Sequence, residues 1–192
     1  MVNRVEGWDG SFDWHEVALD GELACWRDLE ARWMISCEGY RGMHHPHFPW
    51  LPLRPCKGQI LTLATDISLP DRILNRGHWL LPIGAGRVRC GATYEREDIE
   101  SGPTPEGRDE ILCAAQAMFR EDMKWRLQEA AAGMRPGTRD RMPLAGLHPQ
   151  ESRLGVLNGF GSKGVLMAPY YARCMADHLA QDHGIQQVAE HG

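Results

Sequence analysis

Apolar and polar residues alternate near the start of the chain in a way that predicts a β-hairpin. Residues 14–19 have strand character, Asp20 and Gly21 supply a two-residue turn, and residues 22–26 form the return strand. A further short apolar run at 33–37 predicts another strand, which ends at Gly39. These patterns favour strands rather than helices for this part of the chain.

The middle of the chain combines β-like patterns with one clear helix signal. Residues 59–64 alternate, and residues 79–82 and 87–93 predict two strands that flank a glycine-rich turn at 84–86. Thr104 followed by Pro105 predicts a helix start, with threonine as the cap and proline at the first helical position. The apolar residues that follow recur at the spacing of one helix face: Ile111, Leu112, Ala115, Met118 and Phe119.

The C-terminal part predicts a strand, a glycine-rich loop and a helix. An apolar run around Val156 leads into a loop with glycines at 159, 161 and 164, and an amphipathic helical pattern follows. Glycine permits positive φ and close approach of another molecule, and a helix start favours negative charge in front of it. The loop could therefore seat an anionic or electron-rich ligand, or serve only as packing. The residues expected on the inner face of the last helix are Met167, Tyr171, Cys174, Met175, His178 and Leu179.

Composition narrows the class of protein. The 192 residues are 43% hydrophobic and 24% charged, which is typical of a globular chain in water. No run reaches the ~18 consecutive apolar residues of a membrane span, and the N-terminus lacks the layout of a signal peptide, so we expect a cytoplasmic protein. The net charge of −5 and the lack of a long basic block argue against nucleic acid as the main partner.

The spacing of the cysteines and histidines does not predict a metal site. The six cysteines show no CxxC spacing and are expected to be buried free thiols. His44, His45 and His47 lie close together, but prolines 46 and 49 favour an extended loop, and no Cys or carboxylate joins them. We therefore expect no metal site.

Five runs of residues resemble a known family. They are LRPCKGQ at 53–59, GRV at 86–88, GATYE at 91–95, GMRP at 133–136 with DRMP at 140–143, and NGFGSKGV at 158–165. In order and spacing they resemble the C-terminal signature of the FAD-dependent amino-acid and amine oxidoreductases, the D-amino-acid oxidase, glycine oxidase and sarcosine oxidase superfamily. The agreement runs from about residue 33 to residue 180.

The resemblance implies an α+β fold made of parts of two domains. Residues 43–127 would form an antiparallel-sheet substrate-binding domain with a flanking helix. Residues 1–42 would be a remnant of an FAD-binding α/β domain, and residues 128–182 would return to that domain and end in its C-terminal helix. Residues 183–192 would be a polar tail.

One part of the family pattern is missing. Family members open with a strand, a Gly-x-Gly-x-x-Gly turn and a helix that hold the FAD pyrophosphate, and nothing before Trp33 matches them. Glu38, placed before Gly39, also departs from the pattern and puts cofactor contact there in doubt. We therefore expect the C-terminal half of such an enzyme, from a split or truncated gene, or with a separate chain carrying the N-terminal half.

The resemblance also assigns roles in a site. Arg135 would hold the carboxylate of an amino-acid substrate, the alternative being a structural ion pair with Asp140. Lys163 would stabilise the reduced anionic flavin near N1 and the C2 oxygen, the alternative being a solvated lysine. The expected cofactor contacts are Gly133, Gly159, Phe160, Gly161, Ser162, Lys163, Gly164 and Val165. Positions 136–138 hold no cysteine for covalent attachment, so FAD would be bound non-covalently.

Three functions follow from the resemblance. The first is FAD-dependent oxidation of the C–N bond of a small amino acid or secondary amine, by hydride transfer to flavin N5. The second is an inactive fragment, or a non-catalytic subunit of a split flavoenzyme. The third is a relative of the oxidoreductases that act on an aminomethyl group of tRNA, against which the acidic net charge argues.

Overall fold

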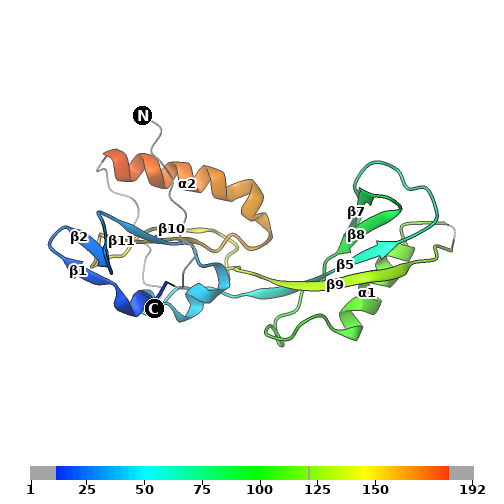
Figure 1. The fold of residues 1–192 in the computed structure, drawn as a ribbon, viewed down its shortest axis with the longest axis horizontal. Helices are drawn as coiled ribbons and strands as arrows, with labels where there is room; N and C mark the ends of the chain where they lie inside the picture. Colours follow the sequence, from blue (N-terminus) through cyan, green and yellow to red (C-terminus); the bar gives the residue numbers. More distant parts are fainter. Residues whose placement is uncertain (1–11, 121, 182–192) are drawn as a thin grey trace. The chain divides into compact units, whose positions relative to one another are not determined.

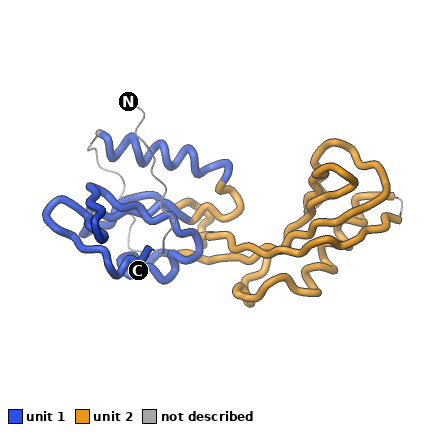
Figure 2. Tube along the Cα trace, in the orientation of Figure 1, with its two compact units in different colours: residues 1–52, 144–158, 165–192 blue, residues 53–143, 159–164 orange. Residues whose placement is uncertain are grey.

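The computed structural model describes residues 12–120 and 122–181, and these form two compact units (Figure 2). Unit 1 is drawn from residues 1–52, 144–158 and 165–192, and unit 2 from residues 53–143 and 159–164. Strands and helices occur in both units, so the fold is α+β, as expected. No helix in the described ranges is long and apolar enough to cross a membrane.

Unit 1 begins with the predicted hairpin. Strands β1 (Ala18–Asp20) and β2 (Leu23–Trp26) pair antiparallel across the turn at Gly21, whose φ is 53°, and β3 (Leu29–Ala31) extends the sheet. The strand prediction is wrong for residues 14–16, which form the 3-10 turn η1 (Trp14–Glu16). The Asp13 carboxylate accepts a hydrogen bond from the His15 amide at 2.9 Å, and this local bond competes with strand pairing.

A second sheet of unit 1 contains the strand predicted at 33–37. Its order is β10 (Leu144–Leu147), β11 (Leu154–Asn158) and β4 (Met34–Ser36), with β4 parallel to β11. The Asn158 amide group donates to the Gly39 carbonyl at 2.8 Å, which joins the end of β11 to η2 (Gly39–His44).

The histidine-rich segment of unit 1 is packed among aromatic rings. The loop expected around prolines 46 and 49 begins at His45, directly after η2, and contains turns at residues 46–47 and 49–50. The His45 ring is 2% exposed and lies 4.3 Å from the Trp14 ring and 4.9 Å from the Phe48 ring, measured between centroids. Burial, reinforced by His47 and His148, lowers the pKa of His45 to about 4.

Unit 2 is a five-stranded antiparallel sheet covered by one helix (Figure 1). The strand order is β6 (Leu74–Arg76), β7 (His78–Gly84), β8 (Arg87–Gly91), β5 (Cys56–Ala64) and β9 (Arg126–Arg135). The strands predicted around 59–64, 79–82 and 87–93 are thereby confirmed.

Helix α1 (Pro105–Gln116) starts as predicted, with Thr104 as its cap and Pro105 at its first position. Ile111 and Ala115 are fully buried against the apolar face of the sheet. The helix ends at Gln116, so Met118 and Phe119 lie beyond it, although both still pack against this core.

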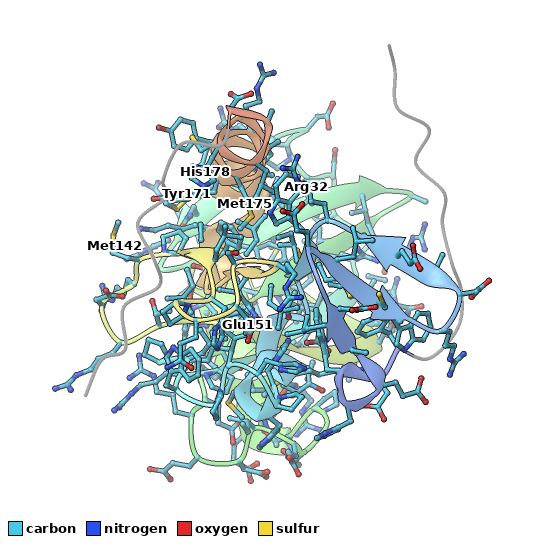
Figure 3. The ribbon with its side chains drawn as sticks, turned by 90° about the vertical axis from the view of Figure 1, so that its left-hand side faces the viewer. Arg32, Met142, Glu151, Tyr171, Met175 and His178 are labelled. Carbon is cyan, nitrogen blue, oxygen red and sulfur yellow. The ribbon has the colours of Figure 1, made fainter. Side chains whose placement is uncertain are left out.

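Helix α2 (Gly164–Gln181) lies along the β10–β11–β4 sheet of unit 1 (Figures 1 and 3). Met175 is buried, and Tyr171 and His178 are half-buried on the same side of the helix. Cys174, expected on this inner face, is exposed. The expectation of buried thiols is likewise wrong for Cys37 and Cys113, and holds for Cys56 and Cys90.

Candidate functional site

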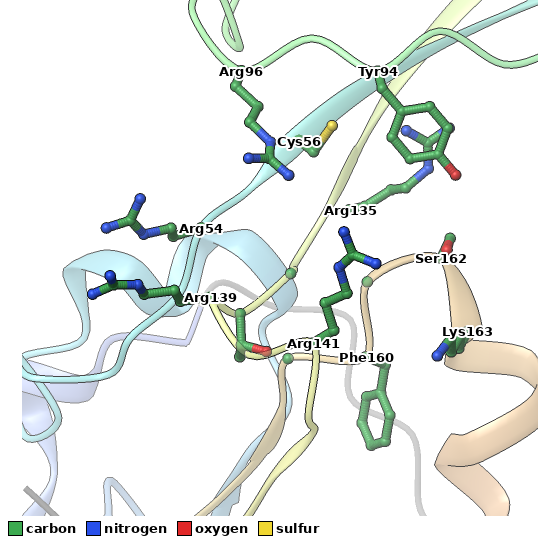
Figure 4. Close-up of a pocket in the computed structure, with 14 residues that line it drawn as sticks. Arg54, Cys56, Tyr94, Arg96, Arg135, Arg139, Arg141, Phe160, Ser162 and Lys163 are labelled. Atoms are coloured by element: carbon green, nitrogen blue, oxygen red, sulfur yellow. The ribbon is translucent and has the colours of Figure 1, made fainter. Parts of the chain in front are cut away.

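One cavity of about 520 Å³ lies entirely within unit 2 (Figure 4). Its cationic lining residues are Arg54, Arg96, Arg135, Arg139, Arg141 and Lys163. The remaining lining residues are Cys56, Tyr94, Gly137, Thr138, Gly159, Phe160, Gly161 and Ser162.

Backbone hydrogen bonds at one turn bring the lining segments together. The turn follows β9, and its Pro136 and Gly137 carbonyls face two other segments. The Gly161 amide donates to the Pro136 carbonyl at 2.8 Å, and the Arg54 amide donates to the Gly137 carbonyl at 2.6 Å. Three stretches that are far apart in the sequence therefore share one cavity.

Arg135, at the end of β9, is held in place by its neighbours. Its Nη1 donates to the Thr93 carbonyl at 3.1 Å, and its guanidinium carbon lies 4.4 Å from the centroid of the Tyr94 ring. A Cβ atom on Gly58 would overlap this guanidinium, so the side chain occupies space that only glycine leaves open. No described carboxylate lies within ion-pair distance of Arg135, so the structural pairing with Asp140 is not formed.

An ion pair between a buried lysine and a partly exposed carboxylate supports the segment that carries Thr93 and Tyr94. Lys57 is 1% exposed, and its ammonium lies 2.7 Å from a Glu95 carboxylate oxygen and donates to the Ser101 hydroxyl. The two backbones also exchange hydrogen bonds, with N···O distances of 2.8 and 3.0 Å. Lys57 is therefore not an exposed charge at the end of a strand. Instead, the pair fixes residues 93–96 against β5.

The glycine-rich segment from Gly159 to Lys163 follows β11. Gly159 and Gly161 have φ values of 77° and 55°, which only glycine adopts readily. A Cβ atom on Gly161 would lie 3.8 Å from its nearest neighbour, so backbone conformation rather than crowding favours glycine there. The Gly161 amide binds the Pro136 carbonyl and the Lys163 amide binds the Phe160 carbonyl at 2.9 Å, so both are used within the protein.

The predicted site residues fall into two groups. The cavity brings together Arg135, Gly159, Phe160, Gly161, Ser162 and Lys163. Gly133 lies exposed in β9, Gly164 begins α2, and Val165 is 98% exposed; none of these three lines the cavity.

Four arginines of the lining were not among the predicted site residues: Arg54, Arg96, Arg139 and Arg141. Each lies inside or directly beside one of the motif runs, so basic residues next to those runs were the available signal. None has a carboxylate partner in the described chain, and the lining contains no Asp or Glu. A cavity lined in this way favours anionic or electron-rich ligands.

Comparison with known proteins matches this chain to one family. Residues 11–178 match the family model described as DAO, FAD dependent oxidoreductase.

Two curated relatives illustrate the match. The tRNA 5-methylaminomethyl-2-thiouridine biosynthesis bifunctional protein MnmC of Marinobacter nauticus is 35% identical over 182 residues, which cover 88% of this chain and 28% of that protein. Glycine oxidase of Bacillus subtilis is 30% identical over 124 residues, which cover 64% of this chain and 34% of that protein.

Among solved structures, iminodiacetate oxidase from Chelativorans sp. BNC1 has a similar fold. The TM-score is 0.74 at 22% identity, covering 89% of this chain and 50% of that one. Glycine oxidase from Geobacillus kaustophilus gives a TM-score of 0.73 at 19% identity, and the match covers 92% of this chain and 51% of that one. The chain thus spans about half the length of these structures, and 28% and 34% of the two curated relatives.

Proposed function

The chain belongs to the DAO family of FAD-dependent oxidoreductases, and from that premise we propose that it forms the C-terminal part of an enzyme that oxidises the C–N bond of an amino acid or secondary amine. The observation that carries the proposal is that Arg135 and the segment Gly159–Lys163 line the same cationic cavity. A substrate carboxylate at Arg135 would then lie in the same cavity as the glycine-rich segment.

The residues present fit the ring end of FAD. Lys163 and five arginines line the cavity and no Asp or Glu does so in the described chain, which suits a ring that gains negative charge. The positive φ of Gly159 and Gly161 lets the backbone approach a flat ligand closely. FAD, when bound, would supply the acceptor for the hydride that leaves the substrate carbon. The absence of a cysteine at 136–138 supports non-covalent binding.

The protein residues would bind and orient rather than transfer protons. The Arg135 guanidinium, which contacts the Thr93 carbonyl and the Tyr94 ring, would bind the substrate carboxylate through two parallel N–H groups. Lys163 would offset negative charge near the glycine-rich segment. The lining formed by the described residues contains no His, Asp or Glu, so the proposed roles of Arg135 and Lys163 are binding and orientation.

Flavin binding by the purified full-length chain tests this proposal. We expect flavin absorption to stay with the protein after free FAD is removed by gel filtration, less of it in Lys163→Met, and the wild-type amount in the exposed control Lys124→Met. Failure of the wild-type chain to bind FAD, alone or after mixing with a separate N-terminal half, would contradict it. FAD binding without oxidation of glycine, sarcosine or iminodiacetate would instead support a non-catalytic subunit.

A second candidate is action on an aminomethyl group of tRNA. It is favoured by the 35% identity to MnmC and by the local excess of arginine in the cavity, despite the net charge of −5. Retention of tRNA that falls steeply with salt would support this candidate. Retention no greater than that of an unrelated acidic protein would exclude it.

A further inference from the structure

Three arginines line the side of the cavity that lies away from Lys163 (Figure 4). Arg54 and Arg139 extend in the same direction, away from Ser162 and Lys163, and Arg96 reaches toward Cys56 from a neighbouring segment (Figure 4). We call Arg54, Arg96 and Arg139 the arginine group.

The backbone fixes the positions from which these side chains extend. Leu53 and Thr138 form a β-bridge, and the Arg54 amide donates to the Gly137 carbonyl at 2.6 Å. The Thr138 hydroxyl donates to the Met142 carbonyl at 2.8 Å, which shapes the turn that carries Arg139. Arg96 directly follows Glu95, whose carboxylate is paired with the buried Lys57. The three chain segments are therefore held together before any ligand binds.

No carboxylate among the described residues pairs with the arginine group. Five arginines elsewhere in the described chain have carboxylate partners: Arg27, Arg108, Arg126, Arg153 and Arg173. None of the three cavity arginines has one among the described residues. Like charges on one wall repel each other, and a bound anion would relieve that repulsion.

We propose that the arginine group is a phosphate subsite, which holds a phosphate group of the substrate while Arg135 and the glycine-rich segment hold the part that is oxidised. This proposal rests on the proposed function. A single arginine fork satisfies a carboxylate, whereas three guanidinium groups match the higher charge and three acceptor oxygens of a phosphate. The substrate class is thus an amine that carries a phosphate ester, either as a small molecule or as part of a nucleotide chain.

Binding of inorganic phosphate to the full-length chain, measured by calorimetry without FAD, tests the subsite. Arg54→Gln, Arg96→Gln and Arg139→Gln are each expected to weaken binding at least about tenfold, because each removes a charge-assisted hydrogen bond. Arg89→Gln is the matched control, since Arg89 is also exposed and without a described carboxylate partner but does not line the cavity. Equal effects of all four substitutions would overturn the proposal.

Further ligands identify the chemistry and its source. O-phosphoserine should bind more tightly than serine, and the preference should disappear in the triple arginine variant. A single-stranded oligoribonucleotide that binds more tightly than O-phosphoserine would support the same subsite and assign the phosphate to a nucleotide chain. Malonate binding as tightly as phosphate, or displacement of phosphate by FAD, would overturn the proposal. Because no step requires flavin or turnover, this result is independent of whether the proposed oxidation is observed.

Discussion

The guanidinium of Arg135 occupies the space where a Cβ atom of residue 58 would stand. Strands β5 and β9 pair so that Gly58 lies opposite Gly133, two residues before the arginine. The Arg135 side chain therefore lies over the backbone of Gly58, which has no side chain, and reaches the Thr93 carbonyl. The identity of residue 58 thus determines the position of Arg135.

Gly58→Ala should displace Arg135 with little loss of stability. The new methyl group meets the flexible end of a side chain rather than backbone, so the free energy of unfolding should fall by no more than about 1 kcal/mol. Carboxylate binding should weaken about tenfold or more, because the arginine fork is misplaced. Calorimetry with glycine checks this, with Gly102→Ala as the control, since a Cβ there meets nothing within 4 Å. Unchanged glycine affinity in Gly58→Ala would show that Arg135 does not bind the carboxylate.

Glu95→Gln should destabilise unit 2. The substitution leaves the buried Lys57 ammonium without its carboxylate partner, so the free energy of unfolding should fall by about 1–3 kcal/mol. The loss should be smaller than for a fully buried ion pair because Glu95 is partly exposed. Urea unfolding provides the measurement. Lys57→Met in the same background should recover part of the loss, since it removes the unpaired charge, and a double variant less stable than Glu95→Gln would contradict this account.

His45 should make stability depend on pH. Its pKa is lowered to about 4 in the folded chain, from 6.5, so only the unfolded chain takes up the proton between these values. Stability should thus be full above pH 6.5 and fall by up to about 3 kcal/mol as the pH drops toward 4. The geometry agrees, because His45 Nδ1 accepts the His47 amide at 3.1 Å and a proton there would break that bond.

Denaturant unfolding at a series of pH values tests this dependence. His45→Gln should flatten the curve over this range, while the exposed control His44→Gln should keep its shape. The Glu38 carboxylate lies 3.8 Å from His45 Nε2, where a negative charge would favour the protonated ring, so Glu38→Gln should steepen the decline. A His45→Gln curve parallel to that of wild type would assign the pH dependence to other groups.

Thr104→Ala should cost about 1 kcal/mol through loss of the α1 cap, since the Thr104 hydroxyl accepts the Gly107 amide at 3.2 Å. Thr104→Ser keeps the hydroxyl and should retain most of the stability. Thermal unfolding distinguishes the two variants. Equal losses in both would attribute the effect to the methyl group instead of the cap.

Local signals in the sequence predicted much of this fold. The Asp20–Gly21 turn, the cap at Thr104 and the apolar face around Ile111 each depend on neighbours within a few residues, and the structure contains all three. Arg135 and the segment Gly159–Lys163, which the family motifs indicated as site residues, line one cavity.

The features that could not be predicted depend on contacts between distant residues. The burial of Lys57 follows from a bridge to Glu95 that lies far along the chain, and nothing in its local sequence indicates it. Arg54 and Arg139 face one cavity only because of the bridge between Leu53 and Thr138. Likewise, the exposure of Cys174 depends on which side of α2 packs against its unit.

Pro136 and Gly137 present adjacent carbonyls to two different segments, one leading to Arg54 and the other to Gly161. A shift of these two adjacent peptide groups would move both ends of the cavity at once. Ligands at the two ends should therefore alter each other's affinity, and thermodynamic linkage requires the same factor in both directions. Occupancy of one end would then be communicated to the other without any change in the surrounding sheet.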